Sequence, residues 1–133
     1  MQEENVQERL TIQQVAEATG LTVFTLRYYE RVGLIHPIDR AENTHRRYTQ
    51  DDIGWIDFLM KLRATGMSIS EMQMYAELQR QGDNTLAERL KMLEALRDKV
   101  EICMAELHRN LEVVCYKIGI YSEIVEKNKQ ATP

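Results

Sequence analysis

The fold of this chain is decided by the stretch from Leu21 to Leu34, L-T-V-F-T-L-R-Y-Y-E-R-V-G-L. Thr22 predicts a helix start, because its hydroxyl can accept from an early backbone N–H, and Gly33 predicts a helix end in the left-handed conformation. At helical spacing, one face of this helix carries Phe24, Arg27, Tyr28 and Arg31. Arginine suits phosphate oxygens and guanine edges, so the stretch is typical of a DNA recognition helix. A solvated basic face beside a buried tyrosine is the alternative.

A shorter helix is predicted directly before this stretch. Thr11 is a suitable cap for a helix over residues 12–19, whose apolar residues fall on one face. Gly20 then allows a tight turn. Two short helices around a turn that contains glycine form a helix-turn-helix, and its second helix is the one that enters the major groove of DNA.

A β-hairpin wing is predicted after the recognition helix. Its first strand, an edge strand, is expected at Leu34, Ile35 and Ile38, and its second strand brings back Arg46 and Arg47. Such a wing would place the two arginines to hold the phosphate backbone beside the groove. An ordinary surface hairpin with a solvated arginine pair is the alternative.

Two further helices are expected beyond the hairpin. Thr49 opens the first, whose apolar residues cover more than one face, so it should be enclosed on two sides with Trp55 in the core. Gly66 ends this helix, and either Ser68 or Ser70 caps the next.

The apolar pattern changes after a break at residues 82–84. A seam of residues at alternating spacings of four and three, all apolar except Arg97, then continues over about five heptads, which predicts a coiled coil. The expected interface residues are Leu86, Leu90, Leu93, Val100, Met104, Leu107, Leu111 and Val114. A lone helix would expose this seam to water, so a second copy of the same chain is the simplest partner. Gly119 is expected to break the helix, so that residues from Tyr116 onward could fold back.

The composition allows DNA binding although the chain is acidic overall. Its net charge is −4 and its pI is about 5.4. Between Thr22 and Tyr48, however, five arginines stand against three acidic residues, a local net charge of +2. Nucleic acid responds to such a local patch more than to the total. The two cysteines and the lack of a signal-peptide pattern or a long apolar run predict a soluble, cytoplasmic protein with no membrane partner.

The ordered motifs resemble those of the MerR-type transcriptional regulators. They are I-x-x-V-A-x-x-x-G-L-x-x-x-T-L-R-Y-Y-E-R-x-G-L-I-x-P from Ile12 to Pro37, R-R-Y-T-x-D-D-I from Arg46 to Ile53 and L-R-x-x-G-M-S-I from Leu62 to Ile69. The resemblance implies a mainly α fold, with a winged helix-turn-helix domain over 10–81 and a dimerising coiled-coil helix over 82–128. The ends, 1–9 and 129–133, are expected to be disordered.

The resemblance also implies a function. Dimers of this family bind an inverted repeat inside an overlong promoter spacer, and a bound effector makes them bend and untwist the DNA for RNA polymerase. Physically this is indirect readout. By motif, the groove and its adjacent phosphates would be served by Thr25, Arg27, Tyr28 and Tyr29. Arg46 and Arg47 would be the wing contacts, and Arg63 with Ser68 the contacts of a second wing. The small effector is unknown.

The cysteines do not predict a metal site. Cys103 and Cys115 are twelve residues apart, about 18 Å along one helix, so a single chain cannot hold one ion with both. Packing beside the seam is the expected role, with metal binding as the alternative, and no cofactor is expected. The tail over 116–121 resembles the aldehyde- and thiol-stress branch of the family. That branch carries a reactive cysteine where this chain has Leu62.

Two other functions compete with a regulator. An excisionase-like architectural DNA-binding protein could use the same helix-turn-helix, although such proteins usually lack a long dimer helix. A coiled-coil interaction module without DNA binding is the other, and the arginine-rich face and wing count against it. An enzyme is not expected, because no nucleophile and base, or metal-ligand cluster, occur at usable spacing.

Overall fold

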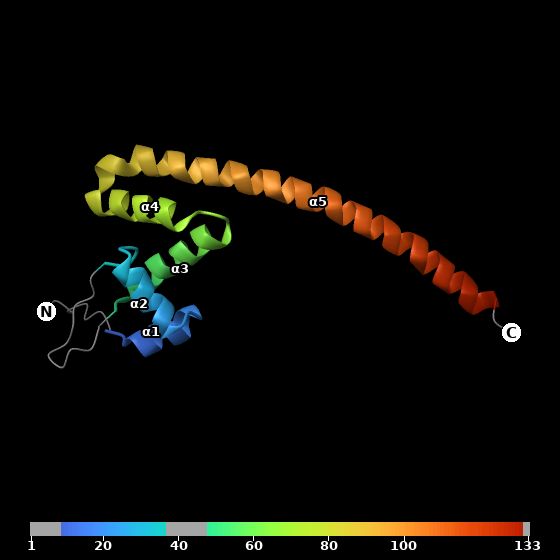
Figure 1. Ribbon diagram of the computed structural model, residues 1–133, viewed down its shortest axis with the longest axis horizontal. Coiled ribbons are helices and arrows are strands. Elements are labelled where there is room, and N and C mark those ends of the chain that lie inside the picture. Colours follow the sequence, from blue (N-terminus) through green and yellow to red (C-terminus); the bar gives the residue numbers. More distant parts are fainter. Residues whose placement is uncertain (1–8, 37–47, 132–133) are drawn as a thin grey trace, which may run out of the picture. The chain divides into compact units, whose positions relative to one another are not determined.

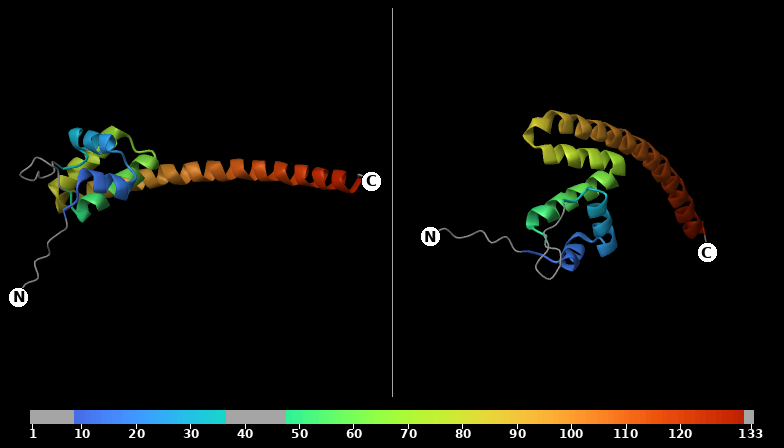
Figure 2. Two further views of the ribbon diagram at one scale, coloured as in Figure 1. Left: turned by 90° about the horizontal axis from the view of Figure 1, so that it is seen from below. Right: turned by 60° about the vertical axis from the view of Figure 1, so that its left-hand side comes forward.

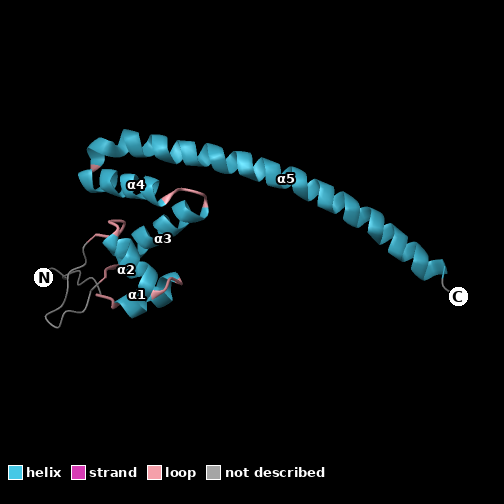
Figure 3. Cartoon of the chain, viewed as in Figure 1, coloured by secondary structure: helices cyan, strands magenta, loops and turns pink. Residues whose placement is uncertain are grey.

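The computed structural model describes residues 9–36 and 48–131 of the 133-residue chain. This described part is built of helices and contains no strand (Figure 1, Figure 3). In chain order the elements are α1 (Ile12–Thr19), α2 (Val23–Arg31), α3 (Gln50–Ala64), α4 (Ile69–Gln81), the short 3-10 helix η1 (Asp83–Thr85) and α5 (Leu86–Ala131). The predicted mainly α fold is confirmed.

Side-chain caps begin the first two helices where the sequence predicts them. Thr11 Oγ1 accepts from the Gln14 backbone N–H at 3.2 Å, and Gln14 Oε1 accepts from the Thr11 N–H at 2.8 Å. Thr22 Oγ1 accepts from the Thr25 N–H at 3.1 Å. Between the helices Gly20 has a φ of 80°, a left-handed conformation that residues with a Cβ disfavour. The turn of the helix-turn-helix therefore needs this glycine.

Reciprocal caps also begin α3 and α4. Thr49 Oγ1 accepts from the Asp52 N–H at 3.2 Å, and Asp52 Oδ2 accepts from the Thr49 N–H at 2.7 Å. Ser68 and Glu71 make the same pair of contacts at the start of α4. Of the two serines considered as caps, Ser68 is the one that the structure uses.

A compact unit extends to Leu93 and contains the four short helices. In it α1 packs on α2 and α3, and α3 packs on α4. The buried apolar residues of this unit are Val15, Leu26, Tyr29, Leu34, Ile35, Tyr48, Ile56, Leu59, Leu62, Met67, Met72, Tyr75 and Ala76. Trp55 is half-buried beside this core, with its ring stacked on Phe58 and Tyr75 at centroid distances of 6.1 Å. Trp55, expected in the core, is thus half-buried where α3 packs on α4.

The strand predicted after α2 is wrong for Leu34 and Ile35. Both residues are 1% exposed. Their backbone N–H groups donate to the Tyr29 carbonyl, at 2.9 and 3.3 Å, and so close the end of α2 instead of joining a strand ladder. These residues are apolar because they fill the core. Ile38 and the rest of the predicted hairpin lie outside the described residues.

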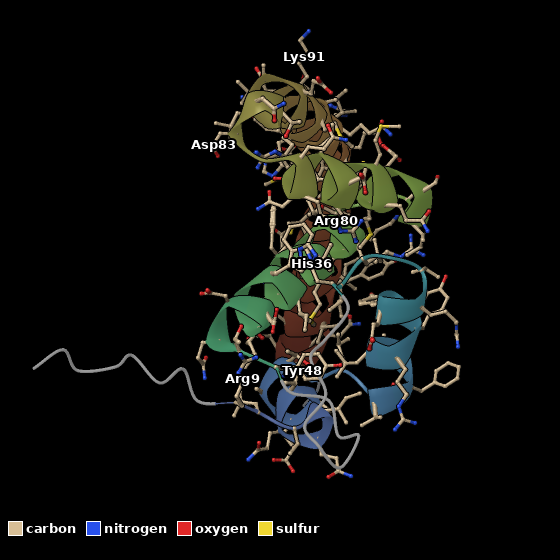
Figure 4. The ribbon with its side chains drawn as sticks, turned by 90° about the vertical axis from the view of Figure 1, so that its left-hand side faces the viewer. Arg9, His36, Tyr48, Arg80, Asp83 and Lys91 are labelled. Atoms are coloured by element: carbon tan, nitrogen blue, oxygen red, sulfur yellow. The ribbon has the colours of Figure 1, made fainter. Side chains whose placement is uncertain are left out.

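Tyr48 connects the first and third helices. It is fully buried, and its backbone exchanges two hydrogen bonds with Leu10, at 2.7 and 2.8 Å, in an isolated antiparallel bridge. In the side-chain view, Tyr48 lies close to the segment of Arg9 that leads into α1 (Figure 4). The bridge fixes the start of α1 against the start of α3.

α5 is one continuous helix, as both views of Figure 2 show, and it contains 46 residues. The predicted break at Gly119 is wrong, because the helix passes through it and ends at Ala131. Residues 129–131, expected to be disordered, are helical. A glycine in a helix costs about 1 kcal/mol but keeps its backbone donor, so the flanking turns can carry the helix through it. From Glu94 onward α5 forms a second unit.

Candidate nucleic-acid interface

The side of α2 that faces away from the core carries the predicted basic row. Phe24 is 76% exposed, and Arg27 and Arg31 are exposed as well. Leu26, on the opposite side of the helix, is fully buried. The helix therefore presents one aromatic ring and two guanidinium groups in a row, spaced three and four residues apart, which suits phosphate and base edges.

The two tyrosines of α2 have different surroundings. Tyr28 is half-buried, and the Arg31 guanidinium lies over its ring at 5.6 Å from the centroid. Tyr29 is 7% exposed and belongs to the core. Its ring centroid is 6.1 Å from that of Tyr28. Tyr28 thus borders the exposed face, held between Tyr29 and Arg31, whereas the side chain of Tyr29 packs inward. The family motif had grouped both with the groove and its phosphates.

Thr25 lies in the first turn of α2. Its hydroxyl oxygen accepts from the Thr22 hydroxyl at 2.9 Å. Because a hydroxyl has one hydrogen and two lone pairs, Thr25 keeps its own hydrogen for another acceptor. A phosphate oxygen near the start of the helix would be a suitable one.

Side chains of α3 and α4 hold the segment directly after α2. Three successive backbone carbonyls of that segment each accept a hydrogen bond from one of these side chains. The pairs are Trp55 Nε1 to Leu34 O at 2.7 Å, Gln73 Nε2 to Val32 O at 2.8 Å, and an Arg80 guanidinium N–H to Gly33 O. Arg80 extends from α4 toward this segment (Figure 4). These three carbonyl contacts fix the end of α2, and hence its exposed face, relative to α3 and α4.

The two residues predicted for a second wing meet at the turn between α3 and α4. Arg63 is exposed and donates from Nη1 to the Met67 carbonyl at 3.3 Å. Ser68 caps α4, and its hydroxyl also donates to Glu71 Oε1 at 2.9 Å. A guanidinium has five N–H donors, so the contact with Met67 leaves Arg63 able to donate elsewhere.

The remaining DNA-contact predictions differ in what the structure says about them. Arg46 and Arg47, predicted for the wing, lie outside the described residues. Phe24 and Arg31 were placed on the outward face by the sequence pattern but were not counted among the contacts. Their exposure adds both to the candidate interface, and the helical spacing from Arg27 was the signal that could have included them.

The predicted dimer seam is exposed along α5. Six of its eight residues are more than half exposed in the single chain, namely Leu86, Leu90, Met104, Leu107, Leu111 and Val114. Leu93 and Val100 are half-buried. An apolar stripe of this length on one side of a helix, interrupted by Arg97, marks an interaction surface.

The two cysteines of α5 are not part of a group of possible metal ligands in the described residues. Cys103 and Cys115 are both exposed on α5 and are free thiols. Within residues 9–36 and 48–131 no three histidine, cysteine or acidic side chains gather in a way that could hold a metal ion. Within the same residues no helix is long and apolar enough to span a membrane.

Comparison with known proteins gives consistent matches. The family model of the MerR HTH family regulatory protein matches residues 10–79. An HTH-type transcriptional regulator of Haemophilus influenzae is 36% identical over 113 residues, which are 85% of this chain and 84% of that protein. The regulator AdhR of Bacillus subtilis is 43% identical over 91 residues, covering 68% of this chain and 65% of AdhR.

Solved structures match over most of the chain. HiNmlR, a MerR family regulator lacking the sensor domain, was crystallised bound to promoter DNA. It superposes with a TM-score of 0.80 at 35% identity, over 87% of this chain and 92% of that one. A putative MerR family regulator from Listeria monocytogenes superposes with a TM-score of 0.79 at 31% identity, over 92% and 99%.

Proposed function

This chain belongs to the MerR family of helix-turn-helix transcriptional regulators, and from that premise we propose that it grips promoter DNA as a homodimer through the exposed face of α2. The observation that carries the proposal is the row of Phe24, Arg27 and Arg31, exposed on the second helix of a helix-turn-helix. The three carbonyl contacts support it, because they fix the end of α2, and with it the direction of that row, relative to α3 and α4. The likeness to HiNmlR, solved with promoter DNA, supports it independently.

Different residues of this interface have different proposed roles. Arg27 reads base edges in the major groove, with Arg31 beside it. Tyr28 and Thr25 donate their hydroxyls to the bordering phosphates. Tyr29, being buried, contributes by supporting the ring of Tyr28. The phosphate backbone of the DNA, on either side of the groove, is contacted by two pairs of residues. Arg46 and Arg47 belong to the predicted wing, and Arg63 and Ser68 lie at the α3–α4 turn.

The dimer is proposed to form through α5. A helix of 46 residues with a long and largely exposed apolar seam is stable in water only when a partner covers that seam. We place DNA binding in residues 10–81 and dimerisation in 82–128. The length of α5 counts against an excisionase-like architectural protein, and the exposed arginine row counts against a module that only mediates protein interactions.

Regulation is proposed to act through the shape of the DNA. Bending a site of 20–30 base pairs costs about 1–6 kcal/mol, so a dimer that holds phosphates on both flanks can set the alignment of promoter elements. RNA polymerase would be the partner that responds, and a small effector, bound in the cytoplasm, would shift the balance between undistorted and distorted complexes.

Selection from a random duplex library tests the proposal. The wild-type chain should enrich an inverted repeat, and Arg27→Ala should lose that enrichment. Arg109→Ala is the matched control, because Arg109 is an exposed arginine on α5, two residues and so about 200° around the helix from Leu107 of the seam. It should select as wild type does. If the folded wild-type chain enriches no sequence, the proposed function is wrong.

A further inference from the structure

We propose that Phe24 reads the C5-methyl group of a thymine in the major groove, and so determines part of the sequence that the protein selects. The inference rests on the proposed function, since it assigns a base to one residue of the proposed DNA-binding face. Phe24 is 76% exposed, and no other large apolar side chain in the described residues is as exposed. Single exposed apolar residues are common, so the argument depends on where this one lies.

Phe24 is the second residue of α2, one position after Val23, which follows the Thr22 cap. Leu26 is fully buried two residues later, so Phe24 points about 200° away from the core side of the helix. In a helix-turn-helix the residues near the start of the second helix are the ones that contact base edges. The fold therefore leaves Phe24 unburied at the position where a side chain would meet the bases.

The neighbours of Phe24 define what it would meet. Arg27 lies one turn further along the same face, and Arg31 one turn beyond that, both exposed. Their positive charges attract the DNA phosphates, so the major groove should face this side of α2. Thr22 and Thr25 beside Phe24 are already joined to each other, hydroxyl to hydroxyl, at 2.9 Å. The local surface around the ring is thus polar and basic, with the phenyl as its most exposed apolar group.

The chemistry of the ring selects its partner. A phenyl group can neither donate nor accept a conventional hydrogen bond, so it gains nothing from a phosphate oxygen or from the polar edges of guanine, cytosine and adenine. The thymine methyl is the apolar group that the major groove offers, and phenylalanine is among the side chains known to contact it. Phe24 should therefore favour thymine, while Arg27 and Arg31 take phosphates or guanine.

The test removes the methyl group without changing base pairing. The probe is the duplex that the wild-type chain enriches from a random library, with each thymine replaced in turn by deoxyuridine in both half-sites. At one thymine position, wild type should lose about fourfold in affinity per half-site, the worth of one buried methyl-sized group. Phe24→Ala should bind the unmodified duplex about tenfold more weakly per half-site and should be insensitive to that same replacement.

Two controls separate this role from others. Met74→Ala removes another exposed apolar side chain of the same unit, from α4 and 61% exposed, and should keep wild-type affinity and wild-type sensitivity to deoxyuridine. Phe24→Ala should melt at the wild-type temperature, because its ring is not part of the core. If Phe24→Ala weakens selected and random duplexes equally, or still senses the missing methyl, the assignment to thymine is wrong although DNA binding stands. If wild type binds no duplex, the proposed function fails and this inference with it.

Discussion

The indole N–H of Trp55 in α3 donates to the backbone carbonyl of Leu34, just beyond α2, at 2.7 Å. Gln73 and Arg80 of α4 hold the two carbonyls before it. Trp55 also stacks on Tyr75, so one side chain joins the aromatic packing of α3 and α4 to the end of the recognition helix. The orientation of the exposed arginine row thus depends on a residue that makes none of the proposed DNA contacts.

Replacing Trp55 with Phe should destabilise the protein and loosen the end of α2. The substitution keeps an aromatic ring beside Phe58 and Tyr75 but removes the donor to Leu34, whose own side chain is buried. A part-buried carbonyl that loses its hydrogen-bond donor costs about 1–3 kcal/mol of stability. Denaturant unfolding at one fixed protein concentration measures this cost, because the stability of a dimer depends on concentration.

Gln73→Ala is the comparison for that variant. It also removes a donor to this segment, but its bond to Val32 is exposed, so water can replace it. The expected cost is at most about 1 kcal/mol. Equal losses for the two variants would mean that burial does not distinguish the bonds. If Trp55→Phe is as stable as wild type, the hydrogen bond from the indole to Leu34 does not stabilise the end of α2.

Local signals predicted most of the helical framework. The caps at Thr11 and Thr49 lie where the sequence indicates them, because capping depends on residues within one turn. The apolar pair Leu34 and Ile35 was predicted as strand because its burial against α2 depends on residues far away in the chain. Helical spacing placed Tyr28 on the outward face and left Tyr29 off it, whereas the family motif counted both tyrosines among the DNA contacts.

Alanine substitutions at two glycines with open surroundings should change the stability of the protein in opposite directions. A Cβ at Gly119 or at Gly20 would meet nothing within 4 Å. Gly119 is inside α5, so Gly119→Ala should stabilise the helix by up to about 1 kcal/mol. Gly20 has a φ of +80°, so Gly20→Ala should destabilise the turn by about 1–2 kcal/mol. Thermal melting of both variants measures the difference. A loss of stability in Gly119→Ala would indicate that the partner helix approaches the backbone there.

Charge placed in the α5 seam should separate the dimer. Leu107 is 69% exposed in the single chain and lies on the predicted seam, so Leu107→Glu would bury a carboxylate at a cost of about several kcal/mol per dimer. Ile102 is 61% exposed on the same helix, but heptad spacing places it on the outer side. Ile102→Glu should therefore remain dimeric in sedimentation velocity at micromolar concentration. A wild-type chain that sediments as a monomer would contradict the dimer.

The salt dependence of DNA affinity should distinguish an arginine that contacts base edges from one that contacts phosphates. Arg27 is exposed on α2, whereas Arg47 lies outside the described residues and its wing role follows from the sequence. Arg47→Ala should weaken binding to the selected duplex and to random duplex alike, and reduce the slope of log affinity against log salt by about one phosphate's worth. Arg27→Ala should cost about 1–3 kcal/mol chiefly on the selected duplex, and so narrow the gap between specific and random binding.

A titration of both variants on both duplexes across a salt series decides between these roles, with Arg109→Ala as the control for loss of one surface arginine. The control should match wild type on both duplexes. It has to be measured at each salt concentration, because removing any cation weakens non-specific attraction at low ionic strength. If Arg27→Ala and Arg47→Ala behave identically, Arg27 contacts only the phosphate backbone of the DNA and not the base edges. Undiminished affinity in both would remove the two arginines from the interface.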